Sequence, residues 1–261
     1  MSNFDKNRTG TGTKEWSEHS YNIQKGCKNN CLYCYARANA LRFKLIASTD
    51  EWKNEVIREN AVKKTWGKKD GVIMFPTTHD ITLNNIKHVI ETLTRMLIAG
   101  NHVLIVSKPC LSCIEQICTE LSDFRSQIMF RFTIGSLNRA DCLFWEPNAP
   151  EPRERLLALI FAYEHGYKTS VSMEPILGDY DEALRTFYAV EQYVTDTVWI
   201  GKMNKVRRRV DLTIPGALDW VAQIECTQDD WNILMLVDRL EVEPKVRWKD
   251  SVKQVIEKCR K

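Results

Sequence analysis

Short apolar runs alternate with longer helical stretches along this chain, and this alternation limits the fold more than any other feature. A buried strand is expected at 72–75, because four apolar residues stand there between Gly71 and Pro76. An amphipathic helix is expected at 83–99, where Gly100 supplies a C-terminal stop signal. Strands that alternate with helices of about 10 to 15 residues indicate βαβ units and a parallel sheet. The strands predicted in this way are 20–24, 72–75, 103–106, 128–134, 169–173 and 197–200.

The helices predicted between and after these strands complete about six βα units. No glycine-rich dinucleotide fingerprint opens the first helix, so a nicotinamide-binding fold has no support. The 261 residues and the hydrophobic fraction of 44% fit one large α/β domain. We divide it into a flexible leader at 1–13, the βα body at 14–205 and a C-terminal cap at 206–261 that belongs to the same domain. The predicted helices are 35–46, 50–69, 83–99, 111–124, 152–164, 181–193, 217–224 and 231–240, and a short segment at 245–248 precedes a terminal helix.

Charge and hydropathy indicate where in the cell this protein is expected and which kinds of partner it is expected to bind. No apolar run reaches the ~18 residues of a membrane span, and the polar start lacks the apolar core of a secretory signal. We therefore expect a cytoplasmic protein with no membrane partner, in which nine cysteines serve as ligands and core thiols rather than as disulfides. The net charge of +3 does not favour a long nucleic acid as partner. We interpret the basic run at 205–209 as a solvated loop.

Three cysteines with C-x3-C-x2-C spacing, Cys27, Cys31 and Cys34, follow the first predicted strand. Iron–sulfur clusters usually take four cysteine ligands. Three thiolates can hold three irons of a [4Fe–4S] cluster and leave the fourth iron open to a small molecule, much as catalytic zinc sites keep one position free. A zinc site would need a fourth ligand, and no Cys or His follows soon after Cys34. The spacing therefore favours a cluster with an open iron.

Polar residues stand directly after each predicted strand. In parallel barrels the chemistry gathers at the carboxyl ends of the strands. Two lysines, a glutamate and a His-Asp pair at one rim indicate a site for a charged ligand. These strand ends are 76–80, 107–109, 135–138, 174–175 and 202–204, and they include His79, Lys202 and Asn204.

The cysteine loop resembles the signature of the radical S-adenosylmethionine (SAM) superfamily. The resemblance implies that SAM binds the open iron, and that the cluster donates one electron and cleaves SAM to methionine and a 5′-deoxyadenosyl radical. That radical would abstract hydrogen from a substrate. The resemblance also implies a partial (β/α)6 TIM-like barrel with a C-terminal helical extension, and a one-electron reductant of the flavodoxin or ferredoxin type.

The polar strand ends can be matched to the parts of SAM. Its ammonium suits the hydroxyl and carboxylate after the second strand, and its carboxylate suits the lysine after the third. The ribose hydroxyls suit polar groups after the fourth and fifth strands, and an aromatic ring just before the last cysteine suits the adenine. The predicted SAM contacts are Tyr33, Thr78, Asp80, Lys108, Ser136, Asn138 and Glu174.

A closer resemblance covers roughly residues 21–178. It rests on Glu-Pro-Asn-Ala-Pro at 146–150, on Arg153 and Arg155, on His-Gly-Tyr at 165–167 and on the stretch 171–178. Together with Lys108, these stretches resemble the spore photoproduct lyase-type branch of radical SAM proteins. That branch contacts SAM through a hydroxyl after strand two, a lysine after strand three and a hydroxyl after strand four. Thr78, Lys108 and Ser136 stand at similar places.

One departure limits what the resemblance implies. The lyase of this branch uses a further cysteine as hydrogen-atom donor, and the nearest candidates, Cys110 and Cys142, stand in no matching motif. We therefore expect the SAM chemistry and not DNA repair. Cys110, Cys113 and Cys118 either ligate an auxiliary cluster or pack in the core.

Other assignments stay open at this point. The alternative function is a non-catalytic Fe–S or zinc module that binds nucleic acid, although a structural metal site needs no charged rim. His79 either transfers a proton or ligates a metal, or it is held by hydrogen bonds to Asp80 or to the backbone. Arg153 or Arg155 is expected to pair with Glu146 or Glu174. The substrate and the product of the expected lyase or other radical-initiated modification are undetermined.

Overall fold

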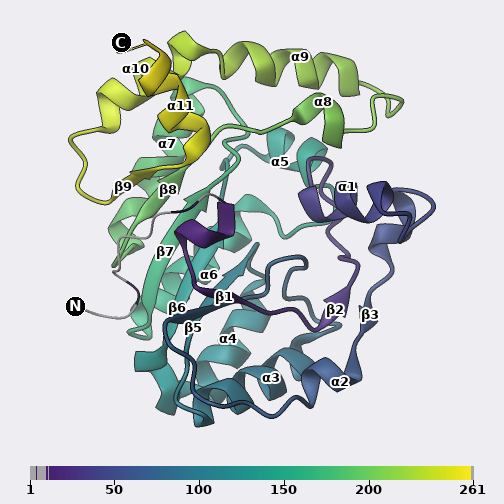
Figure 1. Cartoon of the computed structure of the whole chain (residues 1–261). Coiled ribbons are helices and arrows are strands. Elements are labelled where there is room, and N and C mark those ends of the chain that lie inside the picture. The colour runs from purple at the N-terminus through teal and green to yellow at the C-terminus, as the bar shows by residue number, and fades with distance from the viewer. Residues whose placement is uncertain (1–3, 5–9, 11, 260–261) are drawn as a thin grey trace.

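A seven-stranded parallel sheet forms the body of the protein in the computed structural model, which describes residues 4, 10 and 12–259 (Figure 1). The strand order is β1-β4-β5-β6-β7-β8-β9, and every neighbouring pair is parallel. Within the described residues β1 and β9 are the two edges of this sheet, so the barrel is open. The α/β prediction and the partial barrel are confirmed. The strands are β1 His19–Ser20, β4 Val72–Phe75, β5 His102–Ser107, β6 Ile128–Thr133, β7 Lys168–Met173, β8 Val198–Ile200 and β9 Val246–Trp248.

Helices cover the outer face of the sheet, and most strand residues are buried on both faces of the sheet. In β4, Ile73 and Phe75 pack in the cluster shared with the helices, whereas Val72 and Met74 pack with Trp16 inside the barrel. Successive side chains of a strand point to opposite faces, so four consecutive apolar residues fill two separate cores. The outer helices are α3 Ile86–Ile98, α4 Leu111–Glu120, α6 Pro152–Glu164 and α7 Tyr180–Val190, with 3₁₀ turns at Ser122–Gln127 and Glu191–Tyr193.

Charged residues fill part of the barrel interior. Arg131 of β6 forms an ion pair with Asp196 at 3.6 Å and lies over the ring of Trp16. The 3₁₀ turn Gly12–Glu15 brings Glu15 into an ion pair with Lys249, and both side chains are almost fully buried. The predicted leader at 1–13 falls mostly outside the described residues. Its last part, from Gly12, lines the barrel mouth.

The prediction of a helix at 50–69 is wrong. That segment holds a 3₁₀ turn at Asp50–Lys53, the strand β3 at Val56–Ile57 and the short helix α2 at Glu59–Val62. β3 pairs antiparallel with β2, Gln24–Lys25, so the single strand predicted at 20–24 is divided between two sheets. The charged segment has no apolar stripe that could hold a long helix against the sheet, and its adjacent β-branched residues Val56 and Ile57 form strand pairs instead.

The C-terminal region packs over the cysteine loop and also extends the sheet. Val221 and Ile224 of α9 belong to the same apolar cluster as Cys31 and Tyr33. The short segment expected near 245–248 is the edge strand β9. In the described part of the chain, no helix combines the length and apolar character needed to cross a membrane. The remaining helices are α1 Tyr35–Arg42, α5 Arg139–Trp145, α8 Val206–Arg209, α9 Ala217–Thr227, α10 Asp230–Leu240 and α11 Asp250–Cys259.

Candidate active site

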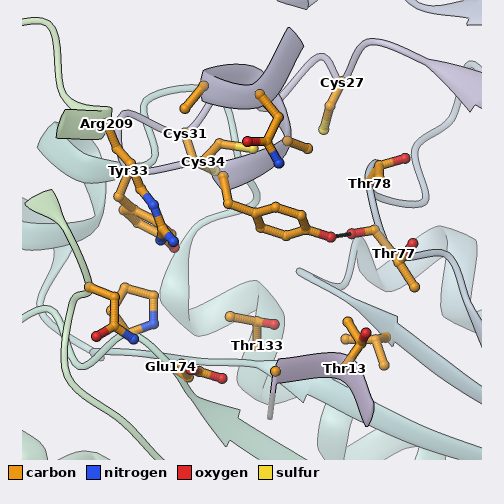
Figure 2. A pocket seen from close by; sticks show the side chains of 18 of the residues that line it. Thr13, Cys27, Cys31, Tyr33, Cys34, Thr77, Thr78, Thr133, Glu174 and Arg209 are labelled. Atoms are coloured by element: carbon orange, nitrogen blue, oxygen red, sulfur yellow. Dashed lines mark hydrogen bonds between the residues drawn. The ribbon is translucent and has the colours of Figure 1, made fainter. Parts of the chain in front are cut away.

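A cavity of about 1090 Å³ opens at the carboxyl ends of the strands. Cys27, Cys31 and Cys34 line it together with residues that follow the strands (Figure 2). Five of the predicted SAM contacts line the same cavity, so the fold brings most of the predicted site together. These five are Tyr33, Thr78, Asp80, Lys108 and Glu174, and the strand-end residues Lys202 and Asn204 also line the cavity.

The cysteine loop is held by backbone hydrogen bonds to two distant segments. The amide of Cys27 donates to the Trp52 carbonyl at 2.7 Å, and that of Leu32 donates to the Trp145 carbonyl at 2.9 Å. Gly26 has φ +81°, and a Cβ there would lie 2.1 Å from the Asn54 carbonyl oxygen. Only glycine allows this close approach. The backbone at Asn54 therefore requires a glycine at position 26, directly before the first cysteine.

Arg37 fixes the loop from inside. Its side chain is buried, and its guanidinium donates to the Asn30 side chain at 3.2 Å and to the Leu32 carbonyl at 2.5 Å. Asn30 itself has φ 42°, a left-handed conformation that asparagine tolerates better than most residues. The Gly, Asn and Arg around the cysteines therefore shape the loop.

The cysteine thiols have the chemistry expected of ligands for a thiophilic metal centre. All three are free, and Cys27 and Cys31 are only 6% and 5% exposed. Burial raises the pKa of Cys27 well above its usual value. Burial also raises the pKa of Cys31 to about 12, although the nearby Lys108 ammonium opposes this shift. A bound metal centre supplies the positive charge that buried thiolates require, so this donor set fits an iron–sulfur cluster.

A single metal ion fits these residues less well. Among the described residues, no group of three or more His, Cys, Asp or Glu side chains is arranged to hold one. Thiolates on one tetrahedral ion must lie within about 4 Å of each other, because each metal–sulfur bond is about 2.3 Å. A four-iron cluster holds its thiolates farther apart, because each cysteine binds a different iron.

Asp80 links the cysteine loop to the strand ends. Its carboxylate accepts hydrogen bonds from Asn29 at 2.9 Å, from the Ser107 hydroxyl at 2.9 Å and from the Lys108 amide at 2.7 Å. Burial raises its pKa, but the Lys108 charge and these hydrogen bonds outweigh burial, and the net pKa is lowered. The Cys27 thiol also lies 3.8 Å from this carboxylate. Asp80 is thus an ionised group with several protein donors already in place.

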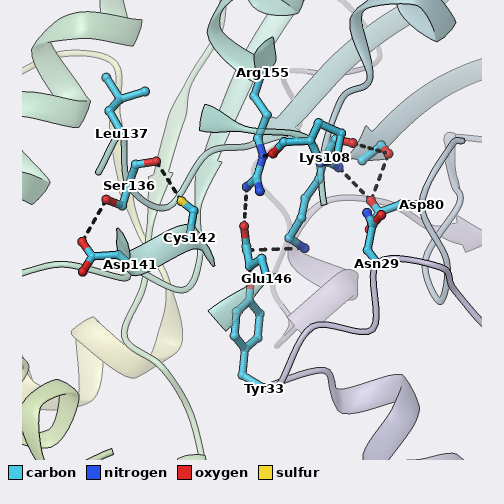
Figure 3. Close-up of polar contacts among 12 residues, drawn as sticks. Asn29, Tyr33, Asp80, Lys108, Ser136, Leu137, Asp141, Cys142, Glu146 and Arg155 are labelled. Carbon is cyan, nitrogen blue, oxygen red and sulfur yellow. Dashed lines mark hydrogen bonds and ion pairs between the residues drawn. The ribbon is translucent and has the colours of Figure 1, made fainter. Parts of the chain in front are cut away.

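Lys108 belongs to a buried charge cluster (Figure 3). Its ammonium lies 3.7 Å from a Glu146 carboxylate oxygen and over the ring of Tyr33. Glu146 also pairs with Arg155 and accepts a hydrogen bond from the Tyr33 hydroxyl. The pairing of Arg155 with Glu146 confirms that part of the prediction. Burial lowers the pKa of Lys108, but the surrounding acidic groups, Cys31 first, raise it well above its usual value.

Two cations therefore share one buried carboxylate in this cluster. Arg155 and Glu146 have fully buried side chains, whereas the Lys108 side chain is 11% exposed and reaches the cavity. Asp80 is a further anion near Lys108, so the charges of the cluster balance, and Lys108 is the cation that can contact an anionic ligand group in the cavity. Glu146 was not among the predicted site residues, because its contacts depend on Tyr33, which is 113 residues away in the sequence.

Ser136 and Asn138 have structural partners away from the cavity. Ser136 is fully buried, and its hydroxyl lies 2.9 Å from Glu182 and 3.2 Å from Asp141. Asn138 is the N-cap of α5, where its side chain accepts from the Ala140 amide at 2.8 Å. Their predicted contacts with SAM gain no support from these positions.

Several residues line the cavity that sequence reasoning did not select. Thr133 is the last residue of β6 and points inward, in phase with Arg131 two residues earlier. Arg209 reaches the cavity from α8, so the basic run at 205–209 lies partly at the site rather than only in a solvated loop. The Tyr35 hydroxyl donates to the Thr77 carbonyl at 2.5 Å. Strand phase could have identified Thr133 from the sequence.

Glu174 and His79 differ in what they can offer a ligand. Glu174 lies at the cavity, where burial raises its pKa and Lys249, at 3.4 Å, opposes that shift. His79 is buried, and burial lowers its pKa. Its ring nitrogens lie 3.4 Å from the Ile23 amide and 3.1 Å from the Asp80 carbonyl. These two contacts favour the structural interpretation of His79.

Comparison with solved structures shows which known fold this chain resembles. Two solved structures of spore photoproduct lyase variants, one with a dinucleoside spore photoproduct, match 94% of this chain with a TM-score of 0.53. The fold of this chain is similar to that of spore photoproduct lyase. The match covers 74% and 73% of those chains at 14% identity, so it confirms the predicted resemblance at the level of the fold.

Sequence comparison adds one viral relative. An uncharacterized protein, ORF301, of Acidianus two-tailed virus is 28% identical over 178 residues, which are 64% of this chain. The match spans 58% of that relative's length. No family model matches the chain.

Proposed function

We propose that this protein is a radical SAM enzyme that holds one [4Fe–4S] cluster through Cys27, Cys31 and Cys34. The observation that carries this proposal is that the three thiols line one cavity with the polar strand ends, in a fold similar to that of spore photoproduct lyase. The bound cluster would supply the electron that cleaves SAM to methionine and a 5′-deoxyadenosyl radical. The chain itself binds, orients and shields the reactants.

In this proposal, different residues of the cavity bind different parts of SAM. Lys108 binds the carboxylate of SAM, because it is the partly exposed cation of the buried charge cluster and reaches the cavity. Thr78 and Glu174 offer acceptors to the ammonium and the ribose hydroxyls. Asp80 acts chiefly by holding Asn29 and the Lys108 amide, which positions the cysteine loop relative to β5.

The cavity is large enough for more than one small molecule. Ligand pockets commonly measure about 300–1,000 Å³, and this one measures about 1090 Å³. It therefore has room for a cluster, for SAM and for the reacting part of a substrate. Trp16 and Trp52 are among the apolar residues of its wall, and they limit the access of water to a reactive radical.

The reaction also requires partners. We propose a one-electron reductant of the flavodoxin or ferredoxin type and a reducing, cytoplasmic location, because oxygen attacks an exposed iron. The reaction is a lyase reaction or another radical-initiated modification. Arg209 and Lys202 at the cavity are candidates for substrate contacts.

The test is SAM cleavage by the full chain. After anaerobic reconstitution with iron and sulfide, dithionite and SAM should yield 5′-deoxyadenosine, measured by chromatography and mass spectrometry. Cys31→Ala should lose iron and product while circular dichroism shows an intact fold, and Cys226→Ala, at an exposed cysteine, should match wild type. A fully loaded cluster that yields no 5′-deoxyadenosine would contradict the proposal. Unfolding of Cys31→Ala would instead indicate a structural metal site.

A further inference from the structure

Two further cysteines, Cys110 and Cys113, lie at the beginning of α4, outside the candidate active site. Cys110 is the N-cap of this ten-residue helix, and Cys113 lies in its first turn. Residues three apart at a helix start lie on the same face. Cys110 is partly exposed, whereas Cys113 is fully buried. One sulfur can thus be reached from solvent, and the other is shielded behind it.

The surroundings of the pair make the two thiols unequal. The Cys110 sulfur lies 3.3 Å from the Ser112 hydroxyl. The hydrogen bond from Cys113 lowers the pKa of Cys110 most, partial burial opposes it, and Ser112 adds to it, so that the pKa is about 6. The same hydrogen bond and burial raise the pKa of Cys113. The accessible thiol is therefore the nucleophile, and the buried thiol keeps its proton.

The third cysteine of this helix cannot join the pair in a metal site. Cys118 follows Cys113 by five residues, which at 3.6 residues per turn puts the two on different faces of α4. Burial raises the pKa of Cys118 to about 12. Of the two interpretations left open by the sequence, an auxiliary cluster therefore gains no support.

We propose that Cys110 and Cys113 form a redox-active dithiol whose substrates are disulfides, such as glutathione disulfide or an exposed protein disulfide. The Cys110 thiolate attacks one sulfur of the disulfide, the disulfide bond breaks, and one thiolate leaves. Cys113 then loses its proton and attacks the Cys110 sulfur, which forms the Cys110–Cys113 bond and releases the second thiol. The protein loses two electrons and two protons, and the disulfide gains them as two thiols. This site does not depend on the proposed SAM chemistry.

Peptide mapping tests the covalent step. The anaerobic full chain is incubated with glutathione disulfide, alkylated and digested with trypsin. Residues 96–125 form one peptide, because Lys108 precedes proline, and the cluster cysteines fall in other peptides. We expect a Cys110–Cys113 disulfide in this peptide, so that Cys118 is its one alkylated cysteine. Its mass should be two hydrogen atoms below that of the same peptide with free thiols at Cys110 and Cys113. Cys113→Ser should instead retain glutathione on Cys110, and Cys118→Ser, the matched control, should still form the disulfide.

The pH dependence of alkylation tests the same proposal without any disulfide. In wild type, Cys110 should react with iodoacetamide at half its maximal rate near pH 6, because its neighbours lower the pKa of this thiol to about 6. Cys113→Ala should move the midpoint upward, because the Cys113 thiol is the largest cause of the shift. A wild-type midpoint at the ordinary value of about 8.5 would overturn the proposal. The proposal would also be overturned if glutathione disulfide left both thiols free, or if reconstitution with iron and sulfide protected both thiols from alkylation.

Discussion

Removing the Lys108 ammonium separates its role toward SAM from its role in the fold. Lys108→Met keeps most of the side-chain length and its contact with the Tyr33 ring, but it deletes the charge. In wild type this charge lies at the cavity wall and 3.7 Å from Glu146. The substitution therefore changes one electrostatic feature of the site and leaves the apolar packing largely in place.

The expected loss of SAM affinity can be worked out from this geometry. A hydrogen bond to a charged group contributes about 1.5–3 kcal/mol, and about 1.4 kcal/mol corresponds to a tenfold change in Kd. Lys108→Met should therefore raise the Kd for SAM by roughly ten- to a hundredfold. The raised pKa keeps the ammonium charged at neutral and mildly alkaline pH, so the difference should be constant across that range.

Folding should be affected much less than binding. Breaking a buried ion pair costs about 3–5 kcal/mol when it leaves a charge without a partner. Glu146 keeps Arg155 and the Tyr33 hydroxyl, so we expect a loss of only about 1 kcal/mol in unfolding free energy. Iron content should not change, because Lys108 is not a cluster ligand.

Calorimetry with SAM on reconstituted protein measures the effect, and denaturant unfolding measures stability. Lys202→Met is the matched control, because Lys202 lines the same cavity but lies 3.8 Å from Asp230. Its affinity for SAM should stay close to wild type. If Lys108→Met also binds SAM within about twofold of wild type, a change of about 0.4 kcal/mol, Lys108 serves only Glu146 and the assigned SAM contact is wrong.

Two further substitutions test the loop and a buried carboxyl group. Arg37→Met should lose about 2–3 kcal/mol of stability and reduce iron content, because Asn30 and Leu32 lose their buried donor. Arg42→Met, at an exposed position of the same helix, should do neither, and equal iron loading of the two variants would refute this role. Burial raises the pKa of Asp141 from 3.8 to about 6, so its protonated form favours the fold. Wild-type stability should therefore fall as pH rises from about 4 to about 6, and Asp141→Asn should flatten this part of the curve; unchanged pH dependence in chemical denaturation would contradict it.

The central strands from β4 to β8 and the cysteine loop could be predicted because their signals are local. Val72–Phe75 is a strand with the predicted bounds, and α6 begins at Pro152 and ends at Glu164 as predicted. Apolar period and Gly or Pro punctuation act within a few residues, and the structure preserves them. The segment 50–69 was predicted incorrectly because its charged residues carry no clear period, and its structure depends on pairing with Gln24 and Lys25.

What the sequence determined by itself is that polar residues follow parallel strands and that three cysteines precede a helix at the same rim. The tertiary structure decided which of those residues face the cavity. Thr133 ends β6 and lines the cavity, whereas Ser136 lies three residues beyond the strand, where its hydroxyl contacts Glu182 and Asp141 instead. The pairing of Lys108 with Glu146 was likewise decided by the fold, since a buried carboxylate takes whichever donors the packing brings to it.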